Sequence, residues 1–215
     1  MADDGASSRR EWGVSVKSMA SAWIASRFLS VAVAFLVVFS LTACASMVSG
    51  RPSAIFDLTV PGEPAPSRGR AQVLVPEPTA VRALDTDRIA ARPSASEYAY
   101  LPGAVWSDRL PRLLQTRLVQ TLQNSGRARA VAVPGQGLLI DYQVVVDVRA
   151  FEYAAEGAVA DFVVRVMDDR TGRVIRSRTF RHVVPIASGG NAGIVQALDY
   201  AMDQAFVEIA NWALG

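Results

Sequence analysis

The stretch LLIDYQVVVDVRAFEYAAEGAVADFVVRVMD, residues 138–168, alternates between apolar and polar side chains over most of its length. Even-numbered residues from Leu138 to Val148 and from Ala160 to Val166 are apolar or aromatic, while Phe151 falls with the odd-numbered set. Successive side chains of a strand point to opposite faces of a sheet. The pattern therefore predicts two long strands whose even-numbered residues face a core.

A third strand is expected over Arg173–Val184, after the turn DDRTG at Asp168–Gly172. Short turns between consecutive strands favour an antiparallel meander. We expect the outer face of this meander to carry acidic side chains on one strand and arginines on the next two, namely Asp141, Asp147, Arg165, Arg176 and Arg178.

Two amphipathic helices accompany the strands. One is predicted over Ser107–Gln123, with a single leucine stripe and Ser107 as its cap; the other begins near its expected cap Asn191 and reaches Trp212. Shorter strands are expected earlier in the chain, at Ile55–Leu58, Ala71–Val75, Arg88–Arg92 and Glu97–Leu101. Because an apolar sheet face must be covered, the predicted fold class is α+β, a mostly antiparallel or mixed β-sheet covered on one face by two amphipathic helices.

The first 43 residues have the pattern of a lipoprotein signal peptide. Phe28–Ala43 is an uncharged run of sixteen residues, which is short for a membrane span and long enough for a signal-peptide core. It ends in Leu41-Thr42-Ala43-Cys44, the form of a bacterial lipobox, in which a peptidase recognises the first three residues and the cysteine sulfur takes a diacylglyceryl group. An ordinary signal peptide or an uncleaved anchor with an incidental cysteine is the alternative.

This interpretation divides the chain into three parts. Residues 1–43 form the signal, with Met19 as an alternative start; residues 44–53 form the acylated cysteine and a short tether; and residues 54–215 form a single periplasmic domain. Two or three acyl chains on Cys44 would tie the protein to membrane lipid, because each buried methylene contributes about 0.8 kcal/mol.

The composition argues against an enzyme, a metal protein and a nucleic-acid-binding protein. Twenty-two basic residues against twenty acidic ones leave a formal net charge of +2, too little to attract nucleic acid. Cys44 is the only cysteine and His182 the only histidine, and the sequence contains neither GxSxG nor HExxH. We expect no catalytic residue, no metal ion and no cofactor besides the acyl chains.

The order of several segments resembles a known family. FDLTV (56–60) precedes VLVPEP (73–78), ALDTDRIAAR (83–92) and YAYLPGAVWSDRLPRLLQTRL (98–118). The positions that carry the resemblance are Val73, Val75 and Pro76, then Leu84, Asp85, Ile89 and Arg92, then Trp106, Ser107, Leu110 and Pro111. Over roughly Ile55–Leu214 the chain is similar to the ABC-type transport auxiliary lipoprotein family, the PqiC-like group.

The resemblance implies a non-catalytic part of a lipid or solvent-resistance transport system. Its implied partners are an ABC permease and ATPase and a periplasmic substrate-binding protein of the mammalian-cell-entry (MCE) type; a homo-oligomer is also compatible. Ala45, in place of aspartate, follows Cys44, which by the usual sorting rule favours the outer membrane over retention at the inner one. An envelope-assembly or structural lipoprotein is the alternative function.

A candidate partner interface lies within twelve residues of the chain. Tyr98, Tyr100, Trp106 and Arg109 are of the residue types that dominate protein interfaces. For Trp106 the sequence leaves a second interpretation open, in which the indole packs the start of the helix onto the core.

Overall fold

The computed structural model describes residues 54–63 and 65–215, and within them the chain forms nine strands and two helices. The helices are α2 (Leu110–Asn124) and α3 (Gly190–Ala213). The strands are β1 (Ala54–Phe56), β2 (Gln72–Leu74), β3 (Thr79–Ala80), β4 (Arg88–Ser94), β5 (Glu97–Trp106), β6 (Ala130–Ala132), β7 (Tyr142–Ala154), β8 (Gly157–Asp168) and β9 (Val174–Val184).

Strand β7 lies at the centre of one mixed sheet. On one edge it pairs with β8 along its whole length, and β8 pairs with β9, which gives the predicted antiparallel meander. On the other edge it pairs in parallel with β2 near its start, β3 in its middle and β4 at its end. Strands β5 and β1 continue the sheet beyond β4, and β6 continues it beyond β2.

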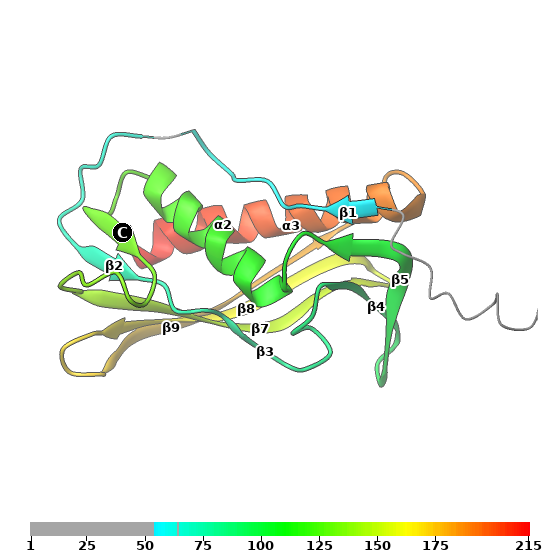
Figure 1. The fold of residues 1–215 in the computed structure, drawn as a ribbon, viewed down its shortest axis with the longest axis horizontal. Helices are drawn as coiled ribbons and strands as arrows, with labels where there is room; N and C mark the ends of the chain where they lie inside the picture. The colour runs from blue at the N-terminus through cyan, green and yellow to red at the C-terminus, as the bar shows by residue number, and fades with distance from the viewer. Residues whose placement is uncertain (1–53, 64) are drawn as a thin grey trace, which may run out of the picture. The chain divides into compact units, whose positions relative to one another are not determined.

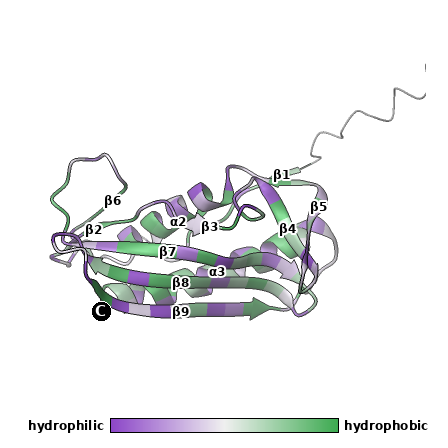
Figure 2. Ribbon diagram, turned by 90° about the horizontal axis from the view of Figure 1, so that it is seen from below, coloured by the Kyte–Doolittle hydropathy of each residue, from purple (hydrophilic) through white to green (hydrophobic). Residues whose placement is uncertain are grey.

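Both helices lie on the same face of the sheet (Figure 1). The core between them contains the even-numbered residues Val144, Val146 and Val148 of β7 and Ala160, Phe162, Val164 and Val166 of β8, all buried. Figure 2 views the sheet from the opposite side, where β7, β8 and β9 lie side by side. The predicted fold class and the predicted buried face of the two long strands are confirmed.

The prediction fails at both ends of the first long strand. Residues 138–141 are not in a strand, and Leu138 is 42% exposed. Near the other end, Arg149 is an extra residue between the pairs Val148–Phe162 and Ala150–Asp161. Such a bulge shifts the alternation by one residue. Phe151 therefore faces the core at 1% exposure, although the sequence placed it on the outer face.

Neither helix has the side-chain cap that the sequence predicted. Helix α2 begins three residues late, with Arg109 at the N-cap, because the Ser107 hydroxyl instead donates a hydrogen bond to Asp57 Oδ1 at 3.0 Å. Helix α3 has Gly189 at the N-cap, and the Asn191 amide donates to the Pro102 carbonyl at 2.9 Å. Both polar side chains thus join separate elements rather than satisfying the helix ends.

Two arginines of β9 lie on the helix side of the sheet, so their predicted outer-face position is wrong. Arg176 and Arg178 stand opposite buried Val166 and Val164. Arg176 donates to the Trp212 carbonyl at 3.0 Å, and Arg178 lies 3.7 Å from Glu208, so both reach α3. In the described sheet β9 pairs only with β8, and inward-pointing charges are a common protection of such an edge.

No helix in the described part of the chain is long and apolar enough to cross a membrane. The predicted signal segment, the lipobox Leu41-Thr42-Ala43-Cys44 and the tether up to residue 53 lie outside the described residues. The assignments made for them, and the domain boundaries, remain predictions.

Val144→Asp should lower the free energy of unfolding by about 3 kcal/mol or more, because an unpaired carboxylate would replace a fully buried side chain. The matched control is Val145→Asp on the opposite face, where the new carboxylate would stand beside Arg165. Denaturant unfolding followed by circular dichroism compares the two. Equal stability of both variants would contradict the assigned faces.

Candidate docking surface

The predicted interface residues fall on the β4–β5 hairpin and on the segment that leads from it into α2. The hairpin tip extends past the sheet on the side away from the helices, at the end of the molecule that carries β1 (Figure 1). We call the residues Arg88, Arg92, Tyr98 and Tyr100 the hairpin surface. All four belong to β4 or β5, and each aromatic ring carries one guanidinium group on its face.

A nearly buried ion pair lies under Tyr98. Arg92 Nε donates to Glu152 Oε1 at 2.8 Å, and the Glu152 side chain is only 5% exposed. The guanidinium carbon of Arg92 lies 4.0 Å from the centre of the Tyr98 ring, so the ring covers the pair. The hydrogen bond that Arg92 donates to Glu152 raises the pKa of Arg92. Burial, followed by the charge of Glu152, raises the pKa of Tyr98.

Tyr100 is held by a second arginine. The guanidinium carbon of Arg88 lies 3.7 Å from the centre of its ring, and its hydroxyl donates to the Ala83 carbonyl at 3.2 Å. Both tyrosines are half-buried. They therefore present a fixed edge of aromatic ring and guanidinium, and a partner would not have to order flexible side chains to bind them.

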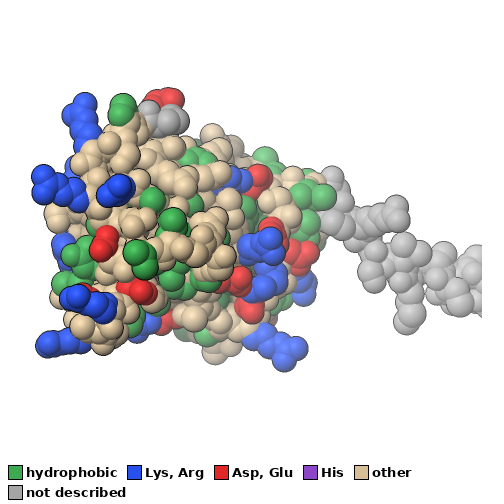
Figure 3. Space-filling model, turned by 60° about the vertical axis from the view of Figure 1, so that its left-hand side comes forward, with side chains coloured by type: hydrophobic (Ala, Val, Ile, Leu, Met, Phe, Trp, Pro, Cys, Tyr) green, Lys and Arg blue, Asp and Glu red, His purple; other side chains and the backbone are tan. Residues whose placement is uncertain are grey.

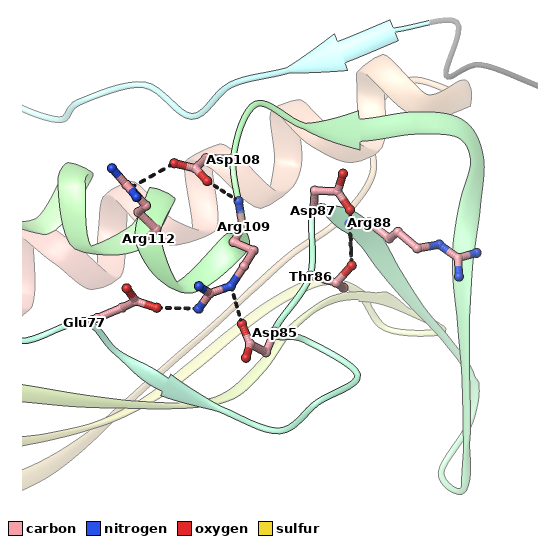
Figure 4. Close-up of polar contacts among 8 residues, drawn as sticks. All are labelled: Glu77, Asp85, Thr86, Asp87, Arg88, Asp108, Arg109 and Arg112. Atoms are coloured by element: carbon pink, nitrogen blue, oxygen red, sulfur yellow. Dashed lines mark hydrogen bonds and ion pairs between the residues drawn. The ribbon is translucent and has the colours of Figure 1, made fainter.

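Arg109 ties the loop before β4 to the start of α2. Its Nε donates to Asp85 Oδ1 at 2.7 Å, and its Nη2 pairs with Glu77 (Figure 4). The hydrogen bonds with Asp85 and then Glu77 raise the pKa of Arg109. Asp108 pairs with Arg112 one turn along the helix at 3.2 Å. The segment is thus a charged, exposed rim beside the hairpin surface.

Trp106 is not part of this surface, because its side chain is 2% exposed. Its ring centre lies 5.8 Å from that of Phe151, which is followed by Phe162 and Phe206 at 6.2 and 5.6 Å. The packing interpretation left open by the sequence accounts for Trp106. The candidate interface keeps Tyr98, Tyr100 and Arg109.

Two kinds of reactive group would point to chemistry at this surface, a metal site and a histidine beside the hairpin. The described residues contain no group of three or more His, Cys, Asp and Glu side chains that could hold a metal ion. His182 lies away from the hairpin and contacts α3, with Nδ1 3.1 Å from Gln204 Oε1 and Nε2 3.4 Å from Glu208. Rings, guanidinium groups and carboxylates fixed in place suit recognition of another protein.

Sequence reasoning missed the residues that fix the tyrosines. Glu152 and Arg92 are 60 residues apart, and Arg109 meets Glu77 and Asp85 across 32 and 24 residues. Glu152 follows Phe151 in what reads as a regular alternation, and only the bulge at Arg149 turns it to the hairpin side. No local pattern in the chain signals these pairs.

A model of the ABC-type transport auxiliary lipoprotein component family matches residues 56–210, which include strands β2 to β9, α2 and most of α3. The chain belongs to this family.

Two solved structures resemble this family member. Protein XCC0632 from Xanthomonas campestris is 30% identical, with a TM-score of 0.69 over 75% of this chain and 94% of that one. An uncharacterized protein is 19% identical, with a TM-score of 0.59 over 74% and 96%, and shows the fold alone. In sequence, an uncharacterized protein of Bradyrhizobium diazoefficiens, bll6063, is 29% identical over 164 residues; these make up 74% of this chain and only 44% of the relative.

Glu152→Ala should destabilise the domain by about 2–3 kcal/mol. Breaking a buried pair typically costs about 3–5 kcal/mol, and Arg92 keeps 27% of its side chain exposed, which reduces the loss. Glu156→Ala is the control, since Glu156 and its partner Arg181 are both about half exposed and such a pair contributes about 1 kcal/mol at most. An equal fall in the melting temperature of both variants would contradict a stabilising role for the Arg92–Glu152 pair.

Proposed function

We propose that this auxiliary lipoprotein is a non-catalytic docking component of an ABC/MCE-type lipid or solvent-resistance transport system. In this proposal acyl chains on Cys44 hold it at the outer membrane, facing the periplasm. Its partner is the periplasmic MCE-type substrate-binding protein that works with the ABC permease and ATPase. The observation that carries the proposal is the family match over residues 56–210.

The position of the hairpin surface supports a docking role near the membrane. Ala54 lies ten positions after Cys44, and an extended chain spans at most about 3.6 Å per residue, so the tether reaches at most about 36 Å. Ala54 pairs with Ala104 of β5, the second strand of the hairpin. A lipid anchor at Cys44 would therefore set an upper limit on the distance between the bilayer and the strand that pairs with β5, and a partner spanning the periplasm would arrive at that membrane.

An envelope-assembly lipoprotein remains the second candidate function. The same fixed aromatic and arginine side chains would serve a structural partner as well as a transport protein. The two functions differ in what binds, so capture of the MCE-type protein separates them.

Metabolic labelling tests the anchor. Labelled palmitate should be incorporated into the wild type. Cys44→Ala should abolish both the label and the membrane retention, because the cysteine sulfur carries the lipid. Ser46→Ala, two residues away, is the matched control and should keep both. Label on the Cys44→Ala protein would contradict the proposed site. Ala45→Asp should move the labelled protein toward the inner-membrane fraction on a density gradient.

Capture of the MCE-type partner by the full, detergent-solubilised protein tests the docking surface. Arg88→Ala combined with Tyr100→Ala should weaken capture at least about tenfold, as expected when interface anchors are truncated. This pair lies apart from Glu152, so the melting temperature should fall by only a few degrees. Tyr200→Ala, an exposed tyrosine on α3, is the control and should bind normally. Full capture by the double variant would place the interface elsewhere, and no capture by the wild type would favour the assembly function.

A further inference from the structure

Two adjoining hollows lie at the end of the molecule opposite the β4–β5 hairpin, around β2 and the C-terminal end of α3. One encloses about 500 Å³ and the other about 410 Å³, within the range of small-molecule sites. They share Gly69, Arg127 and Leu214, so they form one continuous cleft. Arginine and apolar side chains gather over this end of the surface (Figure 3).

The cleft is built from two short arginine segments that precede paired strands. Arg68-Gly69-Arg70 leads into β2 and Arg127-Ala128-Arg129 leads into β6, and these two strands pair in parallel. The Arg68 amide donates to the Gly126 carbonyl at 2.7 Å, and the Arg129 amide donates to the Ala71 carbonyl at 2.8 Å. The approach is so close that a Cβ on Gly69 would lie 1.7 Å from the Arg127 carbonyl oxygen. The arginine backbones are therefore fixed.

The arginines of the cleft are available to a ligand. Arg68, Arg70 and Arg127 are exposed, and their side chains form no ion pair or hydrogen bond with any other described residue. Arg176 of β9 also lines the cleft, but its guanidinium already donates to the Trp212 carbonyl at 3.0 Å. Within the described chain no Asp or Glu side chain lines either hollow, although Gly215, the last residue, lines the second; the nearby Asp141 instead accepts a hydrogen bond from the Gln72 amide at 2.8 Å. Unpaired guanidinium groups favour phosphate, which they bind through paired hydrogen bonds.

The wall opposite the arginines is apolar. Val166, Ile175, Ala213 and Leu214 line the second hollow, and Ile175 is 50% exposed although it is a large aliphatic residue. A free phosphate ion would leave these apolar side chains exposed to water. An acidic peptide would offer them no long hydrocarbon chain to contact. A ligand with a phosphate group next to an acyl chain satisfies both walls, because the chain gains by leaving water and the phosphate gains charged hydrogen bonds.

We propose that this arginine cleft binds an anionic phospholipid, with the phosphate between Arg70 and Arg127 and the start of an acyl chain against Ile175 and Leu214. The site goes beyond the docking function and does not depend on it, since it lies at the other end of the domain from the hairpin surface.

Binding of short-chain lipids to the full protein in detergent tests the cleft. The probes are dihexanoyl phosphatidic acid, the matching dihexanoyl glycerol without phosphate, and inorganic phosphate, each titrated and followed by calorimetry. Phosphatidic acid should bind and the other two should bind at least about tenfold more weakly. Arg70→Gln with Arg127→Gln should lower the affinity for phosphatidic acid at least about tenfold, while Arg82→Gln, an exposed arginine in the loop before β4, should leave it unchanged.

A second variant separates the two walls. Ile175→Ser should weaken phosphatidic acid binding several-fold without changing the response to inorganic phosphate, because only the acyl chain contacts that side chain. Inorganic phosphate binding as tightly as phosphatidic acid would overturn the lipid assignment in favour of a simple anion site. Equal affinity of the Arg70→Gln/Arg127→Gln and wild-type proteins, with melting temperatures confirming that both are folded, would overturn the site itself.

Discussion

Hydrogen bonding along both edges of β7 is the constraint on which the rest of the domain depends. One edge is paired continuously with β8, while the other is divided among three short strands that come from the N-terminal third of the described chain. Strands as short as β2 and β3 have little stability of their own, and pairing with the long strand β7 provides the hydrogen bonds that hold them in place. Strand β6 joins the sheet through β2, and β1 joins it through β5 and β4.

The bulge at Arg149 divides β7 into two parts with opposite orientations. Before it, valines at even positions face the helices; after it, Phe151 joins the aromatic core and Glu152 turns to the hairpin side. A regular strand would have exposed Phe151 and placed a carboxylate in the core, which is costly without a partner. The same irregularity therefore completes the core and supplies the acid that holds Arg92 under Tyr98.

What could be predicted from the sequence was mostly local. Alternation identified the meander and its buried face, and leucine spacing identified α2, because both periods are set by neighbours in the chain. The parallel partners of β7 and the contacts of Arg92 and Arg109 join distant segments, and nothing in their flanking residues records the pairing. The caps failed for a related reason, since Ser107 and Asn191 found distant partners in Asp57 and Pro102. The arginine cleft likewise depends on two segments that are 57 or more residues apart and meet through β2 and β6.

The parallel edge of β7 also sets an order of events during folding. The Gln72 amide of β2 bonds to Asp141, 69 residues further on, so this pairing has to close a long loop. Strands β7, β8 and β9 instead meet through short turns, while β1 can pair with β5, and β2 with β6, before β7 is in place. Because local pairs form faster than distant ones, we expect the meander to form before β2, β3 and β4 join it.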